Sequence, residues 1–311
     1  MSSNHISILM YHDVRNVNNS PFPNRYKEAA TRSITEKTFK DHIQYIKKNY
    51  KVITLDELSS IISSGVINTN YAVLTFDDGL KDHIKVARFL YDVKLPATFF
   101  IPAEPILKKK MMKTHKIQFI IGEQDFKTIK NEILTYFPKK DHNDLWEKYS
   151  KSIWKNNIWT EDQVFITNIL RRYSDKKKSK RICNRLFSRY VTKDEHDLCD
   201  NFYLSLDDIS ELVKTGFTIG GHGYTSENLS DFQGSELVHE FNRMTLFLKA
   251  FYLEKLFMSY PNGGFNDEIL KTVNGFGYSI ALATQDRNIV NAKKENILSL
   301  PRFDAVQHLI I

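Results

Sequence analysis

The sequence has few cysteines, no long apolar run and no secretion signal. Only two cysteines, Cys183 and Cys199, occur among 311 residues, which argues against a disulfide framework and against a cysteine-based zinc site. No apolar run is long enough to span a bilayer, and Ile6–Tyr11 is too short for the hydrophobic region of a signal peptide. These absences predict a cytoplasmic protein without a membrane span.

A stripe of arginines with interleaved aromatic residues is also missing. The net charge of +7 could suit nucleic acid, an anionic membrane surface or an acidic ligand. The lysines, however, are scattered or lie in short runs such as 108–110 and 176–178, without the clustering of a nucleic-acid-binding surface. We therefore predict no nucleic-acid partner. The composition, 41% hydrophobic and 26% charged, is that of a globular protein.

Strand and helix patterns alternate in two separated parts of the chain. Apolar runs over residues 6–11, 72–76 and 97–101 read as strands, and the residues between them keep helical spacing. The same rhythm resumes at Ser205 and continues to a final strand placed ahead of Leu300. Such alternation is typical of parallel βα units. We predict an α/β domain from residues 1–103 and 204–311, interrupted by a mainly helical insertion over residues 104–203.

The most informative stretch is residues 72–79 (AVLTFDDG), where a buried strand ends in two adjacent carboxylates and a glycine. Two neighbouring acids are costly unless positive charge accompanies them. A divalent metal on one acid would supply that charge and leave the other as a base. The alternative is an ordinary strand followed by an Asp-Gly turn.

Three other predicted strands also end in polar residues that could take part in catalysis. These ends carry His12, His222, and Tyr260 with Asn262. Because functional sites in parallel α/β barrels gather at the carboxyl ends of the strands, we expect these side chains to converge with Asp77 and Asp78. This convergence favours an enzyme.

These residues resemble the polysaccharide deacetylase family with its NodB-type domain. Residues 75–79 (TFDDG), 220–229 (GGHGYTSENL) and 260–266 (YPNGGFN) are similar to its first three motifs. Residues 8–12 (ILMYH) and 300–302 (LPR) are similar to the branch that acts on poly-N-acetylglucosamine and related glycans. The resemblance covers most of the chain outside the insertion.

The resemblance implies a distorted (β/α) barrel of about seven strands that hydrolyses N-acyl groups, usually acetyl, on an amino sugar. It implies a divalent metal, with zinc as the expected ion, held by Asp78 and His222. Asp77 would be the general base and His12 the general acid. The backbone N–H of Asn262 would hold the oxyanion, and Arg302 would orient the Asp77 carboxylate.

The sequence departs from the family pattern at two positions. Ser226 stands where the family has a second metal-binding histidine, and Ser259 stands where many members have an arginine. A hydroxyl is a poor zinc ligand beside imidazole or carboxylate. Three interpretations follow: Glu227 or water completes the metal shell, a residue of the insertion does so, or the protein binds glycan or metal without efficient catalysis.

Two function classes therefore stand side by side. The first is a metal-dependent N-deacetylase of a carbohydrate, for which the basic balance would suit a phosphate-bearing substrate; a related hydrolase of formyl groups is a variant of it. The second is a catalytically weak or silent carbohydrate-binding homologue.

Overall fold

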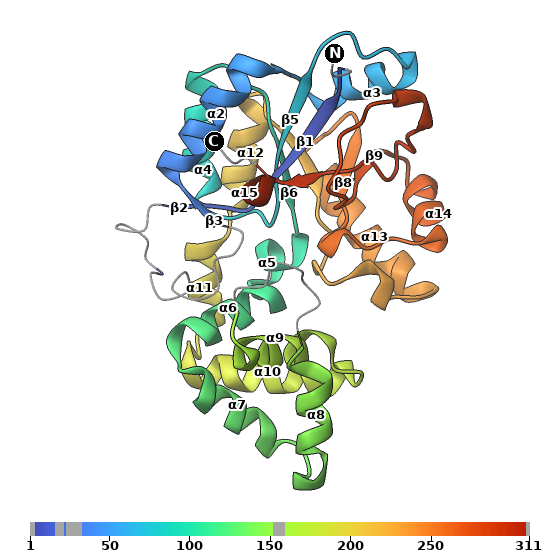
Figure 1. Ribbon diagram of the computed structural model, residues 1–311. Coiled ribbons are helices and arrows are strands. Elements are labelled where there is room, and N and C mark those ends of the chain that lie inside the picture. The colour runs from blue at the N-terminus through green and yellow to red at the C-terminus, as the bar shows by residue number, and fades with distance from the viewer. Residues whose placement is uncertain (1–3, 16–21, 23–32, 152–158, 309–311) are drawn as a thin grey trace. The chain divides into compact units, whose positions relative to one another are not determined.

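Eight parallel strands form the centre of the larger part of the chain (Figure 1). The computed structural model describes residues 4–15, 22, 33–151 and 159–308. The sheet order is β10-β1-β5-β6-β7-β8-β9, with β4 also pairing with β5. The strands are β1 (Ile6–Tyr11), β4 (Lys51–Val52), β5 (Tyr71–Phe76), β6 (Thr98–Ile101), β7 (Thr218–Gly221), β8 (Leu256–Ser259), β9 (Tyr278–Leu282) and β10 (Phe303–Asp304). A separate parallel pair is formed by β2 (Asp13–Arg15) and β3 (Ser33–Thr35).

Leu300 and strand β10 connect β9 to β1. Leu300 forms a parallel bridge with Leu282 at the end of β9, and Phe303 pairs with Leu9 of β1. The sheet therefore curves round on itself, and the predicted distorted (β/α) barrel with a helical insertion is confirmed. The final strand is a correction, because it follows Leu300 and Pro301 instead of preceding them.

Helices pack around this sheet (Figure 1). Capping side chains explain where several begin. Ser205 and Asp208 form a reciprocal capping box, as do Thr54 and Glu57, and each satisfies backbone N–H groups of the first helical turn. The helices of this part are α2 (Glu36–Asn49), α3 (Leu55–Ser64), α4 (His83–Asp92), α5 (Ala103–Lys108), α12 (Leu206–Lys214), α13 (Ser235–Lys249), α14 (Asp267–Gly275) and α15 (Ala305–His308), with short 3-10 turns η3 (Leu229–Asp231), η4 (Pro261–Gly263) and η5 (Ala292–Lys294).

Alternate residues of the strands fill one side of the sheet. Ile6 and Ile8 of β1 and Tyr71 and Val73 of β5 belong to one buried cluster that α3 also enters through Leu58. Every residue of β1 and β5 is buried, as expected for parallel strands that are covered on both faces. This packing fixes the strands whose carboxyl ends carry the predicted site.

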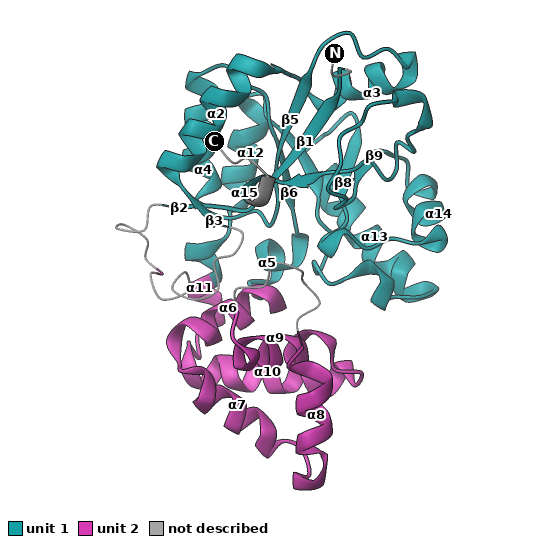
Figure 2. Ribbon diagram, in the orientation of Figure 1, with its two compact units in different colours: residues 1–16, 32–110, 199–311 teal, residues 17–31, 111–198 magenta. Residues whose placement is uncertain are grey.

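The chain divides into two compact units (Figure 2). The barrel unit comprises residues 1–16, 32–110 and 199–311, and the second unit comprises residues 17–31 and 111–198. The predicted boundaries at residues 104 and 203 stay a prediction. The described elements of the second unit are helical: α6 (Lys113–Glu123), α7 (Phe126–Thr135), η2 (Lys139–Asp141), α8 (His142–Tyr149), α9 (Glu161–Arg172) and α10 (Lys176–Tyr190), while α11 (Glu195–Phe202) crosses the boundary.

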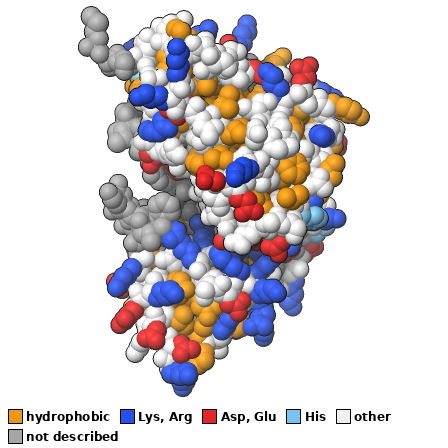
Figure 3. Space-filling view, turned by 90° about the vertical axis from the view of Figure 1, so that its right-hand side faces the viewer, with side chains coloured by type: hydrophobic (Ala, Val, Ile, Leu, Met, Phe, Trp, Pro, Cys, Tyr) orange, Lys and Arg blue, Asp and Glu red, His pale blue; other side chains and the backbone are white. Residues whose placement is uncertain are grey.

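The positive charge of the chain belongs to the second unit. Its residue ranges contain 21 Lys and Arg against 13 Asp and Glu, whereas the barrel ranges contain 23 against 24. Figure 3 shows Lys and Arg side chains spread over the exposed surface of the helical unit. The net charge of +7 therefore says little about the barrel and its site.

No described helix combines the length and the apolar character that crossing a bilayer requires. The cytoplasmic location stays a prediction.

Candidate active site

Strand register brings His12 and Asp77 side by side. β1 and β5 pair in parallel from Ile6 with Tyr71 to Tyr11 with Phe76. His12 and Asp77 are the next residues on the two strands, and the Asp77 N–H donates to the carbonyl of Tyr11 at 2.9 Å. The first two predicted site positions are thus neighbours because of the sheet alone.

Register also sets His222 beside Ser259. Gly221 of β7 pairs with Ile101 of β6 on one side and with Met258 of β8 on the other. His222 therefore follows β7 next to Ser259, the last residue of β8. The close approach of the strands requires glycine at position 220, since a Cβ there would lie 2.5 Å from the Phe100 ring.

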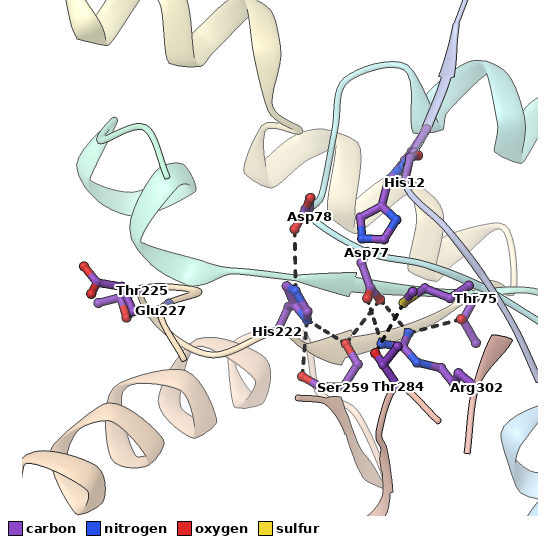
Figure 4. A network of polar contacts seen from close by, with 12 residues as sticks. His12, Thr75, Asp77, Asp78, His222, Thr225, Glu227, Ser259, Thr284 and Arg302 are labelled. Carbon is purple, nitrogen blue, oxygen red and sulfur yellow. Dashed lines mark hydrogen bonds and ion pairs between the residues drawn. The ribbon is translucent and has the colours of Figure 1, made fainter. Parts of the chain in front are cut away.

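Asp77 is buried and fully engaged by donors (Figure 4). The two terminal guanidinium nitrogens of Arg302 donate to the two carboxylate oxygens, each at 2.8 Å. The Ser259 hydroxyl donates to Oδ1 at 3.2 Å. Arg302 is itself fully buried and also donates to Thr75 Oγ1 at 3.3 Å. Such bidentate pairs combine charge with fixed geometry.

The surroundings of Asp77 keep it ionised. Burial alone would raise the pKa of Asp77. The charge of Arg302 and its hydrogen bonds, together with electrostatic interactions with His222 and His12, hold the pKa below its usual value. The carboxylate is therefore charged at neutral pH and can accept a proton. The Arg302–Asp77 contact that the resemblance implied is present in the structure.

Asp78 faces the His222 imidazole. Asp78 Oδ1 and His222 Nε2 lie 3.5 Å apart, and both side chains are buried. This separation exceeds that of an ordinary hydrogen bond. Two ligands of a tetrahedral zinc at about 2.0–2.2 Å lie roughly 3.3–3.5 Å apart. The pair therefore fits two adjacent positions on a divalent cation.

Three predicted site residues occupy an unusual backbone conformation. Asp78, Ser226 and Asn262 have φ values of 76°, 58° and 57°, in the left-handed region that non-glycine residues seldom adopt. They lie in the turns that follow β5, β7 and β8. Lys94, Lys109 and Tyr252 also have positive φ, so this conformation describes the three turns and is not in itself a mark of the site.

The loop after His222 brings no further acidic ligand to the pair. Within the described ranges, no three His, Cys, Asp or Glu side chains are grouped so that they could hold a metal ion. Thr225 is bound to Glu240 through its N–H and its hydroxyl, at 2.7 and 2.9 Å. In Figure 4, Thr225 and Glu227 lie to one side, away from Asp78 and His222. Ser226 is buried in this loop.

His12 lies near Asp77, on the side away from Arg302 and Ser259 (Figure 4). Its Nδ1 is buried and makes no hydrogen bond within the described chain. Its carbonyl accepts from Nε2 of the fully buried His83 at 2.9 Å. Burial lowers the pKa of His83, which favours the neutral imidazole. His83 thus anchors the backbone of His12 from behind.

The sequence analysis missed two of these contributors, His83 and the hydroxyl of Ser259. His83 lies in an ordinary helix pattern, so nothing local distinguishes it. From the sequence, Ser259 was noted only as a departure from the family pattern. Its contact with His222 depends on the register between β7 and β8.

The fold and the site define a class: a parallel (β/α) barrel whose strand ends gather two adjacent carboxylates, Asp77 and Asp78, with Arg302 and His222. A family model described as polysaccharide deacetylase matches residues 186–281. The predicted resemblance to the polysaccharide deacetylase family, a family of hydrolases, is thereby confirmed. A search of curated proteins found no match.

Several solved structures share the fold at low sequence identity. The Streptococcus pyogenes deacetylase PplD in complex with acetate has a TM-score of 0.59 at 14% identity, covering 97% of this chain and 92% of that one. IcaB from Ammonifex degensii has a TM-score of 0.57 at 14% identity, covering 98% and 94%. The BpsB deacetylase domain from Bordetella bronchiseptica has a TM-score of 0.52 at 12% identity, covering 97% of each.

Proposed function

We propose that the protein is a metal-dependent hydrolase that removes N-acetyl groups from an amino sugar in a polysaccharide or glycan precursor. One observation carries the proposal. A buried carboxylate, Asp77, is clamped by Arg302 beside a second carboxylate, Asp78, that faces an imidazole nitrogen across 3.5 Å. A base and a cation site at adjacent residues are what hydrolysis of an unactivated amide requires.

Asp78 and His222 would hold the cation, with zinc as the expected ion. When bound, such an ion polarises a carbonyl and lowers the pKa of bound water. Imidazole nitrogen and carboxylate oxygen suit zinc. A catalytic zinc site usually has three protein ligands, and the pair supplies two. Ser226 is the third position that the family resemblance indicates, and its hydroxyl is a weaker donor.

The chain's own residues supply the proton transfers. Asp77 takes a proton from the attacking water, and Arg302 keeps its two oxygens in a fixed plane while it does so. His12 gives a proton to the departing amine, which is otherwise a poor leaving group. The backbone N–H of Asn262, in the turn after β8, donates to the oxygen on which negative charge develops.

The resemblance to polysaccharide deacetylases supports a carbohydrate substrate. PplD and the BpsB domain are named as deacetylases, and PplD was solved with acetate. We infer an N-acetylated amino sugar as the substrate of this chain, with amine and acetate as products.

A second candidate function is a carbohydrate-binding homologue with little or no catalysis. Ser226 in place of a histidine, together with the two-ligand pair, favours it. This candidate requires the sugar to bind without release of amine.

The experiment is amine release from N-acetylglucosamine oligomers by purified protein loaded with zinc or cobalt, with metal content measured in parallel. We expect close to one ion per chain and measurable amine. Asp78→Ala should abolish metal binding, and Asp77→Asn should bind metal but lose about 10²–10⁴-fold in kcat/KM. Asp92→Asn, an exposed acid at the end of α4, is the control and should match the wild type. Sugar binding without amine release would establish the binding homologue, and the hydrolase mechanism fails if no metal binds after loading.

A further inference from the structure

Ser259 stands between the two halves of the site. It is the last residue of β8, its side chain is fully buried, and the register of β7 and β8 sets it beside His222. His222 Nδ1 lies 2.7 Å from the Ser259 hydroxyl and 3.2 Å from the Ser259 carbonyl. The same hydroxyl donates to Asp77 Oδ1 at 3.2 Å. One small side chain thus contacts both His222 and Asp77.

The direction of these hydrogen bonds follows from what each atom can do. The Ser259 carbonyl can only accept, so His222 Nδ1 must carry the proton. The Asp77 carboxylate is charged and can also only accept, so the hydroxyl proton of Ser259 points to Asp77. The serine oxygen then accepts from His222 Nδ1. This order gives a consistent series of donors and acceptors from imidazole to hydroxyl to carboxylate.

In the neutral imidazole of His222, a proton on Nδ1 leaves Nε2 without one. Its lone pair is then directed toward the side where Asp78 Oδ1 lies 3.5 Å away. A neutral imidazole with a bare nitrogen is the form that binds a cation, and partners on the other ring nitrogen set this tautomer and the ring orientation in metal sites.

We propose that Ser259 is a positioning residue that holds His222 as the Nδ1–H tautomer, with Nε2 free to bind a cation, while it donates a third hydrogen bond to Asp77. The inference deepens the proposed function and rests on the cation site between Asp78 and His222. It also gives a reason for serine at a position where many family members have arginine. Here the guanidinium that clamps Asp77 comes from Arg302, so position 259 is available to His222.

The test uses a matched pair of variants, Ser259→Thr and Ser259→Val. Both add a similar bulk at the same buried position, and only threonine keeps the hydroxyl. Long-range ¹H–¹⁵N NMR of metal-free, histidine-labelled protein reports which ring nitrogen of His222 is protonated, with His222→Gln for assignment. Zinc affinity is measured by competition with a chelator. Neither measurement needs turnover.

We expect the Nδ1–H tautomer in the wild type and in Ser259→Thr. Ser259→Val keeps only the longer contact of His222 Nδ1 with the carbonyl, at 3.2 Å, and loses the 2.7 Å contact with the hydroxyl. It should therefore show a larger share of the Nε2–H form than Ser259→Thr and bind zinc about 10–100-fold more weakly. Ser179→Ala is the control, because it removes another buried serine whose hydroxyl donates to the Leu170 carbonyl. It should leave both readouts unchanged.

Two results overturn the inference: an Nε2–H tautomer in the wild type, or equal zinc affinities for Ser259→Thr and Ser259→Val. A protein with the expected tautomer and zinc pattern that releases no amine supports the role of Ser259 and removes only the proposed activity.

Discussion

The two adjacent carboxylates at the end of β5 occupy opposite kinds of environment. Asp77 accepts two hydrogen bonds from Arg302 and one from Ser259, at 2.8, 2.8 and 3.2 Å. Asp78, one residue later with φ of 76°, turns toward His222 Nε2 at 3.5 Å. Neighbours in sequence thus have different partners: Arg302 and Ser259 for Asp77, and His222 for Asp78.

Because Asp77 and Arg302 are buried, both charges need close hydrogen-bond partners. Taking a carboxylate and a guanidinium out of water costs several kcal/mol per ion, and only good geometry with additional hydrogen bonds offsets it. The Asp77–Arg302 pair has both, and the pKa of Asp77 is held low despite burial. In the proposed function, Asp78 and His222 would be only two ligands of the cation, so metal affinity should respond strongly to each ligand that is added or removed.

The largest effect is expected from removing Arg302, the main partner of Asp77. Arg302→Met leaves Asp77 buried without its main partner and should lower the free energy of unfolding by about 3–5 kcal/mol. Urea unfolding followed by circular dichroism measures it. Asp77→Asn combined with Arg302→Met removes both charges and should recover a large part of the loss.

Arg287→Met is the matched control for Arg302→Met. Arg287 also forms a bidentate pair with a carboxylate, that of Glu295, at 2.7 and 2.8 Å, but its side chain is 48% exposed. Exposed pairs contribute roughly 0–1 kcal/mol. Equal losses for the two arginine variants would mean that burial does not set the value of the Asp77–Arg302 pair.

A smaller effect is expected from adding a third potential metal ligand beside Asp78 and His222. Ser226→His places an imidazole at the position of the missing ligand, and histidine is among the residues that tolerate positive φ. We expect zinc to bind at least about tenfold more tightly, equal to about 1.4 kcal/mol. Calorimetric titration measures this change. Ser230→His, on the exposed turn that follows, should have no effect. An unchanged affinity for Ser226→His would show that residue 226 does not face the cation.

The sequence was sufficient to predict the strands and the residues at their ends, because parallel strands and their polar termini are local patterns. Ile6–Tyr11 was predicted with its observed bounds. The final strand was misplaced, because Phe303–Asp304 is only two residues long and is recognised by its pairing with β1.

The hydrogen bonds of the site could not be predicted in the same way. The Ser259 contacts join residues that are 37 and 182 positions apart, and those of Arg302 span 225. Resemblance to a family suggested Arg302 as a partner of Asp77, but no local pattern indicates that a serine hydroxyl lies between His222 and Asp77. That fact depends on register and burial, which only the folded chain defines.

The smallest effect concerns the loop that carries Ser226. Glu240 of α13 is buried, and its Oε1 accepts from the Thr225 N–H and hydroxyl. Burial raises its pKa, so the folded state binds this proton more readily than the unfolded chain does. The stability contributed by Glu240 is therefore present below the unfolded pKa of about 4.3 and is lost as pH rises through the folded pKa.

Glu240→Gln keeps an acceptor oxygen for Thr225 and removes the charge. We expect little change in the free energy of unfolding at pH 4, and a gain on the order of 1 kcal/mol at pH 7, the scale of most single-residue effects. Urea unfolding at the two pH values measures the difference, with Glu236→Gln, exposed on the same helix, as the control. A gain of equal size at both pH values would exclude the buried charge as its cause.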